Sequence, residues 1–249
     1  MKEEKHNNLN KTFARRIARS LTDINKRAIR EVLPGCLFSK ERLLTSVFHK
    51  QYLEIGFGMG EHFINQIKHN PLSLYIGAEV FMNGVANVLK QVGYIKNSSN
   101  NPQFTANTDG QENFLIWPDD VDLIIAQIPS SSLDGIYVLF PDPWHKRRYL
   151  KKRLLNAARL ANLKDKLKDG GFISFASDIE DYFLYVKQLF TENGNFIIQN
   201  KDHSLPHEGY VETKYHKKAI KGGRVAQFIT ATYQKKVVDF VKYCLYYPR

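Results

Sequence analysis

Several short apolar runs of this chain carry or precede an acidic residue, at positions where the strands of a parallel sheet would end. Glu54 lies in QYLEI, Glu79 closes LYIGAE, and Asp142 comes soon after IYVLF. Asp109 follows QFTAN, a fourth run of this kind. Because the carboxyl ends of parallel strands meet at one edge of a sheet, where open α/β folds bind ligands, these carboxylates are predicted to share a site.

A glycine-rich turn follows the first of these runs. The stretch LEIGFGMGEH places Gly56, Gly58 and Gly60 between a predicted strand and a predicted helix, where a ligand can approach the backbone closely. A dinucleotide-binding turn would have its third glycine at position 61. This chain has Glu61 there, and its charge would repel a pyrophosphate from the helix N-terminus.

The glycines and acids together fit a cofactor that has a cationic centre and no phosphate. S-adenosyl-L-methionine is such a cofactor, because its sulfonium and amino groups gain from nearby carboxylates such as Glu54. Glu79 stands where α/β nucleotide sites keep the carboxylate that accepts from both ribose hydroxyls, and Asp109 could accept from the adenine amino group. Glycine-rich turns and strand-end acids also occur in α/β proteins that bind no ligand, so the pattern alone leaves both readings open.

Asp142 stands in the stretch PDPWHKRRYLKKR. Pro141 and Pro143 restrict the backbone on both sides and remove donors, so the carboxylate is predicted to lie in a stiff, sharply turned segment. Such rigidity suits a group that acts on a substrate. The basic residues that follow could meet phosphates, and Trp144 could pack or stack on a base, although a run of charges is also typical of a solvated helix face.

From residue 50 onward, apolar runs alternate with segments of helical period, which predicts repeated βαβ units and a parallel sheet. Strands are predicted at 51–55, 74–79, 103–107, 135–140, 171–176, 195–199 and 225–233, and helices at 61–69, 82–92, 111–116, 119–127, 148–168 and 179–192. The last two strands are separated by a polar insert, 200–224, in place of a helix, which favours an antiparallel closing strand. The predicted fold class is therefore α/β, with a seven-stranded, mostly parallel sheet, an antiparallel last strand and helices on both faces.

The first 45 residues differ in composition from the rest of the chain, because they are mostly polar and basic. FARRIARS and INKRAIREVLP within them are predicted to form short helices. We interpret residues 1–45 as a basic arm and residues 46–249 as a single catalytic domain, since 249 residues suffice for one sizeable α/β domain with extensions. The C-terminal stretch KKVVDFVKYCLYYPR could continue the last strand or form a short helix.

The formal net charge of +11 favours anionic partners, with nucleic acid ahead of anionic membranes. No apolar run approaches the roughly 18 residues of a spanning helix, and the opening MKEEKHNNLNK lacks the apolar centre of a secretory signal, so we expect a cytoplasmic location and no membrane partner. Cys36 and Cys244 form no pair and no His/Cys cluster at ligand spacing, so no metal is expected.

The motifs LEIGFGMG, IGAEV, FPDPWHKRR, SDIEDY and TKY, in this order, resemble those of the bacterial tRNA (guanine-N7)-methyltransferase family. The resemblance covers about residues 45–233. FPDPWHKRR is highly specific to that family, whereas most adenosylmethionine-dependent methyltransferases share the glycine turn. The resemblance implies a Rossmann-like class I methyltransferase fold. It also implies transfer of a methyl group from S-adenosyl-L-methionine to N7 of guanine 46 in the variable loop of tRNA.

The resemblance also implies roles for individual residues. In such enzymes the acids that match Glu54, Glu79, Asp109 and Asp142 line the cofactor pocket. The residues that match Lys146, Asp178, Thr213 and Lys214 contact the substrate. SDIED can also be read as a helix start, with Ser177 or Asp178 as the N-cap and acidic residues in the first turn.

One position departs from the family pattern, which usually continues TKFE where this chain has TKYH. Tyr215 preserves the ring of the phenylalanine. His216 stands where a substrate-side glutamate is expected, and a neutral histidine is a weaker acceptor for the guanine N1 and N2 hydrogens than a carboxylate. Two alternatives therefore stay open: an RNA-binding relative with impaired catalysis, and a methyltransferase with a substrate other than tRNA.

Guanine N7 carries no proton at neutral pH, so methyl transfer to it needs alignment and electrostatics more than a base. The methylated guanine is cationic, and a fixed carboxylate near the ring lowers the energy of the developing charge. We assign this catalytic role to Asp142. The partners expected are tRNA and the methyl donor, with the protein a monomer or a homodimer.

Overall fold

A computed structural model of the chain describes residues 20–92, 94–98, 101–105 and 112–235. Asp109, Cys244 and most of the predicted C-terminal tail lie outside these residues. Residues 1–19 of the predicted basic arm also lie outside them.

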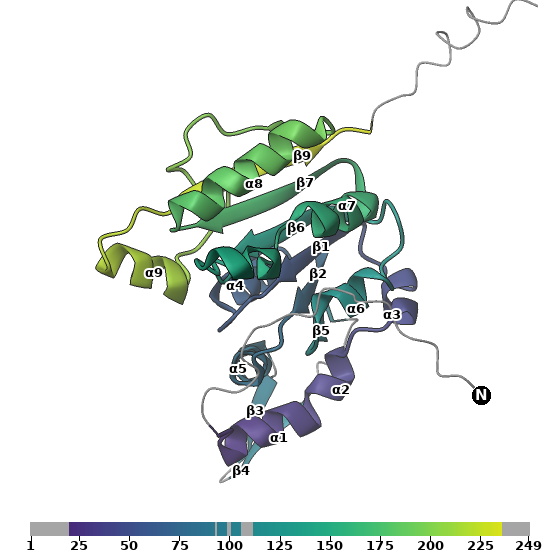
Figure 1. The fold of residues 1–249 in the computed structure, drawn as a ribbon. Helices are drawn as coiled ribbons and strands as arrows, with labels where there is room; N and C mark the ends of the chain where they lie inside the picture. The colour runs from purple at the N-terminus through teal and green to yellow at the C-terminus, as the bar shows by residue number, and fades with distance from the viewer. Residues whose placement is uncertain (1–19, 93, 99–100, 106–111, 236–249) are drawn as a thin grey trace, which may run out of the picture.

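Seven strands form the central sheet, in the order β5-β2-β1-β6-β7-β9-β8 (Figure 1). Their bounds are β1 Lys50–Ile55, β2 Ser73–Ala78, β5 Phe114–Trp117, β6 Leu133–Leu139, β7 Leu167–Ser177, β8 Phe196–Ile198 and β9 Gln227–Tyr233. The first five strands in this order are parallel, and β9 runs antiparallel to both β7 and β8. The predicted fold class is confirmed. The direction of strand order reverses between β1 and β6, which is where open α/β sheets place their ligand sites.

Helices cover both faces of the sheet. They are α1 Asp23–Glu31, α2 Leu33–Cys36, α3 Lys40–Leu44, α4 Glu61–His69, α5 Met82–Val92, α6 Val121–Ile125, α7 Ala157–Lys166, α8 Glu180–Asn193 and α9 Lys214–Lys221, with a 3₁₀ helix, η1, at Arg147–Lys152. In Figure 1, α6, α7 and α8 lie on the near face of the sheet. Helices α4 and α5 pack on the opposite face, where their apolar residues join those of β2 and β6 in a second core cluster.

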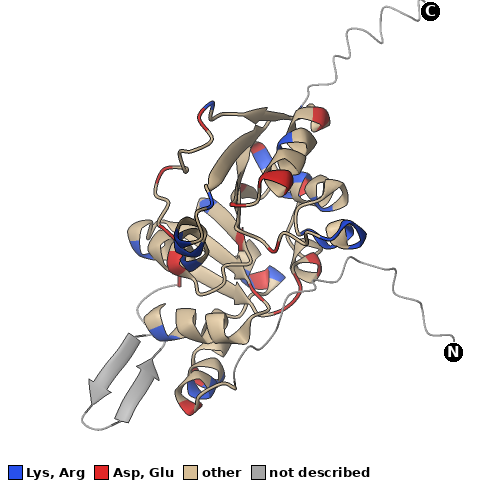
Figure 2. Cartoon of the chain, turned by 60° about the vertical axis from the view of Figure 1, so that its left-hand side comes forward, with Lys and Arg blue, Asp and Glu red and all other residues tan. Residues whose placement is uncertain are grey.

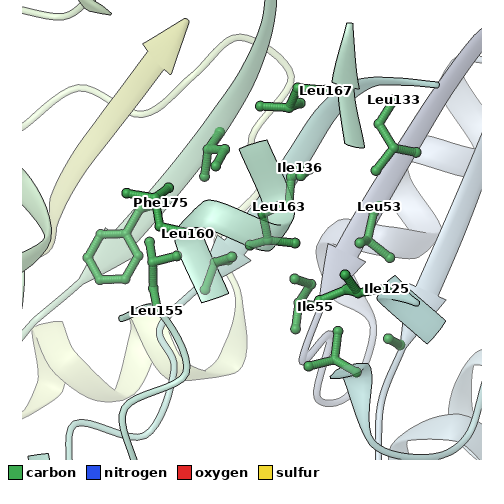
Figure 3. Packing of buried hydrophobic residues seen from close by; sticks show 14 of the residues in the cluster. Leu53, Ile55, Ile125, Leu133, Ile136, Leu155, Leu160, Leu163, Leu167 and Phe175 are labelled. Carbon is green, nitrogen blue, oxygen red and sulfur yellow. The ribbon is translucent and has the colours of Figure 1, made fainter. Parts of the chain in front are cut away.

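The core follows from the strand sequences. Leu53 and Ile55 of β1 face the first cluster, with leucines of α7 and Phe175 of β7 (Figure 3). Tyr52, the residue before Leu53, faces the other cluster, because successive side chains of a strand point to opposite faces. Strands that are buried on both faces read as continuous apolar runs, which is why β2 and β6 stood out in the sequence.

Two predicted elements around residue 110 were wrong. The strand predicted at 103–107 is not in the main sheet, because Asn101–Thr105 forms β4, which pairs only with β3, Tyr94–Ser98, among the described strands. The helix predicted at 111–116 is instead the edge strand β5, which pairs in parallel with β2. A four-residue apolar run such as FLIW carries too few residues to separate helix from strand by periodicity.

Two further elements differ from the prediction. The polar insert 200–224 contains a helix, α9. The single helix predicted at 148–168 is divided into η1 and α7, because Arg153 closes η1 and Asn156 caps α7 through its side-chain oxygen, 3.0 Å from the backbone nitrogen of Arg159.

The N-terminal helices contribute to the core. Ala28 and Val32, in and just after α1, are buried in the second cluster, and Leu43 of α3 is buried in the first. Residues 20–45 of the predicted arm therefore include segments that pack on the domain.

Within the part of the chain that the structure describes, no helix has the length and apolar character needed to cross a membrane. The same residues contain no group of three or more His, Cys, Asp or Glu side chains that could hold a metal ion.

Candidate active site at the carboxyl edge of the sheet

The glycine turn after β1 has a left-handed backbone at all three predicted positions. The φ angles are 74° at Gly56, 58° at Gly58 and 84° at Gly60. The turn packs closely against α5, because a β-carbon at Gly60 would collide with the side chain of Val88. A β-carbon at Gly56 would meet nothing within 4 Å. The turn is therefore supported by α5 and open beside Gly56, as a backbone that receives a ligand must be.

Glu79 comes directly after β2 and is 7% exposed. Its Oε2 accepts a hydrogen bond from the backbone nitrogen of Gly58 at 2.6 Å, and its Oε1 accepts one from Phe81 at 2.8 Å. Burial raises the pKa of the Glu79 carboxyl to about 6, against the effect of these backbone donors, and the charge of Asp142 raises it further. Glu79 thus fixes the glycine turn, and burial raises the pKa of its carboxyl above that of an exposed glutamate.

Glu54 lies in a different environment, a buried chain of polar side chains. Its Oε2 is 2.8 Å from Nδ1 of His62, a fully buried residue of α4. His62 Nε2 is 3.0 Å from Nε2 of His207, and His207 Nδ1 is 2.8 Å from Oγ of Ser174. One set of neutral tautomers satisfies every link, with Ser174 donating to His207, His207 to His62, and His62 to Glu54.

The polar chain joins β1, α4, β7 and the loop that leads to α9. Burial lowers the pKa of His207 to about 3, and the neighbouring His62 adds to this effect, so the imidazole of His207 is neutral at physiological pH. No local sequence pattern indicates this pair, because His62 and His207 are 145 residues apart.

Asp142 lies in a turn held by unusual backbone angles. Phe140 and Trp144, on either side of the Pro-Asp-Pro segment, have φ angles of 52° and 45°, in the region that non-glycine residues rarely adopt. The Asp142 side chain is exposed, and its charge raises the pKa of both Glu79 and Tyr215. The structure therefore brings the predicted acids after β2 and β6 into electrostatic range of one another.

Helix α9 extends over the glycine turn. Thr213 caps it, and its side-chain oxygen is 3.2 Å from the backbone nitrogen of His216. Tyr215 is 48% exposed, and its ring lies 3.1 Å from the position that a β-carbon on Gly58 would take. Burial of the hydroxyl and the charges of Asp142, Glu79 and Glu61 raise the pKa of Tyr215. Lys214 begins the helix and is exposed.

His216 is in the first turn of α9, and its side chain packs against residues outside the helix. Its Nδ1 is 2.9 Å from the hydroxyl of Tyr210, and its ring stacks on Phe140 with centroids 5.4 Å apart and an interplanar angle of 21°. The imidazole thus ties α9 to the end of β6, two residues before Asp142.

Asp178 follows β7 and forms an ion pair with Arg224, whose Nε is 2.6 Å from its Oδ2. The alternative reading of Asp178 as a helix cap was wrong, because the N-cap of α8 is Ile179, without a side-chain bond to the helix. Arg224 is a partner that sequence reasoning missed.

Basic side chains follow the Pro-Asp-Pro turn, in and beside η1. Lys146 precedes η1 and is exposed, as are Arg147, Arg148 and Lys151. Lys152 Nζ lies 5.0 Å from the ring centroid of Trp144 and 4.5 Å from that of Tyr149. Figure 2 shows Lys and Arg spread over several helices, interrupted by Asp and Glu.

The strand order, the glycine turn after β1 and the acids after β2 and β6 define a Rossmann-like methyltransferase. A solved structure described as an antibiotic-related methyltransferase has this fold, with a TM-score of 0.55, 20% sequence identity, and coverage of 79% of this chain and 94% of that one. The family model described as "Putative methyltransferase" matches residues 49–228. These likenesses fix the fold and the class.

A tRNA (guanine-N(7)-)-methyltransferase of Rhizobium johnstonii is 31% identical over 88% of this chain and 92% of its own length. The chain therefore belongs to the tRNA (guanine-N7-)-methyltransferase family, within the adenosylmethionine-dependent methyltransferases. The predicted family resemblance and cofactor class are confirmed. A bifunctional methyltransferase of Rickettsia conorii is 52% identical over 89% of this chain, but that match is only 40% of the Rickettsia protein. The chain thus spans about two fifths of the length of that relative.

Proposed function

We propose that this chain transfers a methyl group from S-adenosyl-L-methionine to N7 of guanine 46 in the variable loop of tRNA. The observation that carries the proposal is the placement of Asp142 in a stiff turn at the switch point of the sheet, within electrostatic range of Glu79 beside the glycine turn. Membership of the tRNA (guanine-N7-)-methyltransferase family supports the same reaction.

The residues around the glycine turn fit the methyl donor. The turn is open beside Gly56, and Glu79 presents a buried carboxylate next to it. We infer that these residues bind the donor, together with Gly58, Gly60, Glu54, Asp109 and Asp142. Glu54 already has one oxygen on His62, so it acts on the donor through its second oxygen or through the position of β1. When bound, adenosylmethionine supplies an electrophilic methyl group on a cationic sulfur.

Asp142 is the proposed catalytic residue. Guanine N7 is already nucleophilic, so no side chain has to remove a proton, and the barrier falls through alignment and electrostatic stabilisation. Charge moves to the guanine ring during transfer. A carboxylate that is fixed before the reaction stabilises this charge without the cost of reorganisation.

On the substrate side, we infer that Asp178 accepts from the guanine N–H groups. Arg224 occupies its Oδ2, and a carboxylate has further lone pairs on its other oxygen. The remaining proposed substrate contacts are Lys146, Thr213, Lys214, Tyr215 and His216. Tyr215 lies over the glycine turn, so a guanine that reaches the donor passes its ring.

The partner proposed is tRNA, bound in the cytoplasm by a monomer or homodimer. The net charge of +11 and the exposed lysines and arginines of η1 and α9 support RNA binding through phosphates. Affinity for tRNA should then fall steeply as salt rises, because each neutralised phosphate releases counterions.

The experiment that tests the function measures transfer of labelled methyl groups from adenosylmethionine to unmodified tRNA, followed by mapping of the base-labile N7 product. A matched transcript with adenine at position 46 serves as the control. We expect label on the guanine-46 transcript and none at that site in the control. Label at another nucleotide would refute the assignment to position 46. Bound donor and tRNA without transfer would favour an RNA-binding relative with impaired catalysis.

A further inference from the structure

Arg153, the residue that closes η1, is an arginine with only 3% of its surface exposed. A buried guanidinium is costly unless it is paired and hydrogen-bonded. Here Nε donates to the backbone oxygen of Pro143 at 2.9 Å, Nη2 forms an ion pair with Asp181, and the guanidinium carbon lies 4.5 Å from the ring centroid of Tyr182.

These contacts join two loops that leave the sheet side by side. Pro143 directly follows Asp142, in the loop after β6. Asp181 is in the first turn of α8, three residues after Asp178, in the segment that follows β7. Strands β6 and β7 are neighbours in the sheet, so one side chain links the two segments that carry the proposed catalytic and guanine-binding acids.

The geometry of the guanidinium makes this link rigid. Its donors lie in one plane at fixed angles, so a bond from Nε and a bond from Nη2 set the direction of both partners together. A lysine could reach one of the two acceptors but has no second donor in a fixed direction. Because Pro143 is restricted in φ, a bond to its carbonyl constrains the turn that contains Asp142.

We infer that Arg153 is a positioning residue that sets the orientation of the Asp142 turn relative to Asp178. The expected effect of Arg153 on the rate of methyl transfer rests on the proposed function. Its effect on the order of the Asp142 turn does not. Arg153 does not touch the donor or the guanine; it acts through Pro143 and Asp181.

The chain offers a matched control in Arg159, which is 4% exposed. Its Nε and Nη2 lie 2.7 and 2.8 Å from the two carboxylate oxygens of Asp122 in α6, and its Nη1 donates to Leu154. Asp122 lies in α6, outside the segments after β6 and β7. Leu154 directly follows Arg153, but it is part of neither the Pro141–Pro143 turn nor the first turn of α8. Arg159→Lys therefore removes an equally buried, bidentate arginine without loosening the Asp142 turn.

The test compares Arg153→Lys with Arg159→Lys in two measurements. The first is steady-state methyl transfer to tRNA. We expect Arg153→Lys to lower kcat by about tenfold or more with KM for tRNA changed by less than about twofold, since small misplacements of a reacting group cost large factors in rate. Arg159→Lys should keep kcat within about twofold, measured at a temperature where both variants are folded.

The second measurement does not depend on activity. The chain has two tryptophans, Trp117 and Trp144, and Trp144 directly follows Pro143. In a Trp117→Phe background, the fluorescence emission and anisotropy of Trp144 report the order of the loop. We expect Arg153→Lys to change this signal and Arg159→Lys to leave it unchanged.

An unchanged Trp144 signal in Arg153→Lys would overturn the inference, as would an equal loss of kcat in both variants. If Arg153→Lys does not fold, Asp181→Asn decides, because it keeps an acceptor but removes the charge that orients Nη2. A change in the Trp144 signal for Asp181→Asn supports the inference, and no change overturns it. Failure of the proposed function would appear separately, as absence of methyl transfer by the wild-type protein, and the fluorescence result would still decide the role of Arg153.

Discussion

Replacement of Glu79 by glutamine tests the cofactor side of the site. The wild-type carboxylate accepts from the backbone nitrogens of Gly58 and Phe81 and is 7% exposed. Glutamine has the same shape, but its amide group presents one oxygen and one NH₂, so one of the two backbone donors loses its acceptor. A hydrogen bond to a charged group contributes about 1.5–3 kcal/mol. At pH 7, however, burial already disfavours the ionised carboxylate, as its raised pKa shows, and the neutral amide avoids a cost of similar size. We therefore expect the free energy of unfolding at pH 7 to change by less than about 1 kcal/mol.

The effect on donor binding follows from the same carboxylate. If the ribose hydroxyls of adenosylmethionine donate to Glu79, loss of the charge costs about 1.5–3 kcal/mol of binding free energy, which raises Kd about 10- to 150-fold. The exposed Glu192 on α8 supplies the control substitution, Glu192→Gln, for which we expect no change in Kd.

The pH dependence sharpens the test, because stability and binding should change in opposite directions. The pKa of Glu79 is raised from 4.5 to about 6 in the folded protein. Between pH 4.5 and 6 the Glu79 carboxyl is protonated in the folded protein and largely ionised in the unfolded chain. Protonated Glu79 therefore contributes to the free energy of unfolding in full below pH 4.5, and this contribution is lost as the pH rises through 6. Its size is about 2 kcal/mol, for a shift of roughly 1.5 pKa units. Donor binding needs the ionised form and should tighten as the pH rises through 6.

Calorimetric titration of adenosylmethionine and urea unfolding, both from pH 5 to 8, measure the two curves in wild type, Glu79→Gln and Glu192→Gln. The reasoning would be refuted by a Glu79→Gln variant that binds the donor as tightly as wild type at pH 7.5. A wild-type affinity that does not vary between pH 5 and 8 would refute the assigned protonation.

Three further substitutions test other parts of the site. Asp142→Asn should reduce turnover by roughly a hundredfold or more, the scale of one lost preorganised electrostatic contact, and turnover near that of wild type in the labelled-methyl assay would remove Asp142 from its role. The pKa of His207 is lowered from 6.5 to about 3 in the folded protein, so its contribution to stability is present above pH 6.5 and is lost as the pH falls towards 3. Acid unfolding, followed by circular dichroism, should therefore depend less steeply on pH in His207→Gln than in wild type. Equal slopes would contradict this expectation. His216→Glu should have activity equal to or above wild type, since the Tyr210 hydroxyl can donate to a carboxylate, and a large loss would show that the imidazole has a function of its own.

The parts of the fold that could be predicted from the sequence are those with strong local signals. Strands β1, β2, β6 and β7 contain apolar runs bounded by glycine, proline or acidic residues. β2 and β6 are buried along nearly their whole length, and β1 and β7 are buried towards their carboxyl ends. Strand β5 is also mostly buried, but its four residues are too few to show a strand period. It is a strand because it pairs with β2 at the edge of the sheet. Its identity depends on a partner about 40 residues away, which no local pattern records.

The candidate site divides in the same way. The local sequence predicted the glycine turn, Glu79 and Asp142 at strand ends. Residues that directly follow buried parallel strands lie at the carboxyl edge of the sheet, so their common location could be predicted as well. The side chains that hold these groups were not predicted. The pairs Arg153–Asp181, His62–His207 and Asp178–Arg224 are separated by 28, 145 and 46 residues, so only the packed structure brings them together.

These long-range contacts change the explanation of why the Asp142 turn is stiff. The two prolines account for restricted backbone angles, but prolines alone do not fix the direction in which a turn leaves the sheet. Arg153 holds the turn at Pro143, from the side of α8. His216 packs on Phe140 at the start of the turn, from the side of α9. The substitution of glutamate by histidine at position 216 therefore lies in a contact that supports the proposed catalytic carboxylate. Its consequence for activity should depend on packing against Phe140 as much as on hydrogen bonding to guanine.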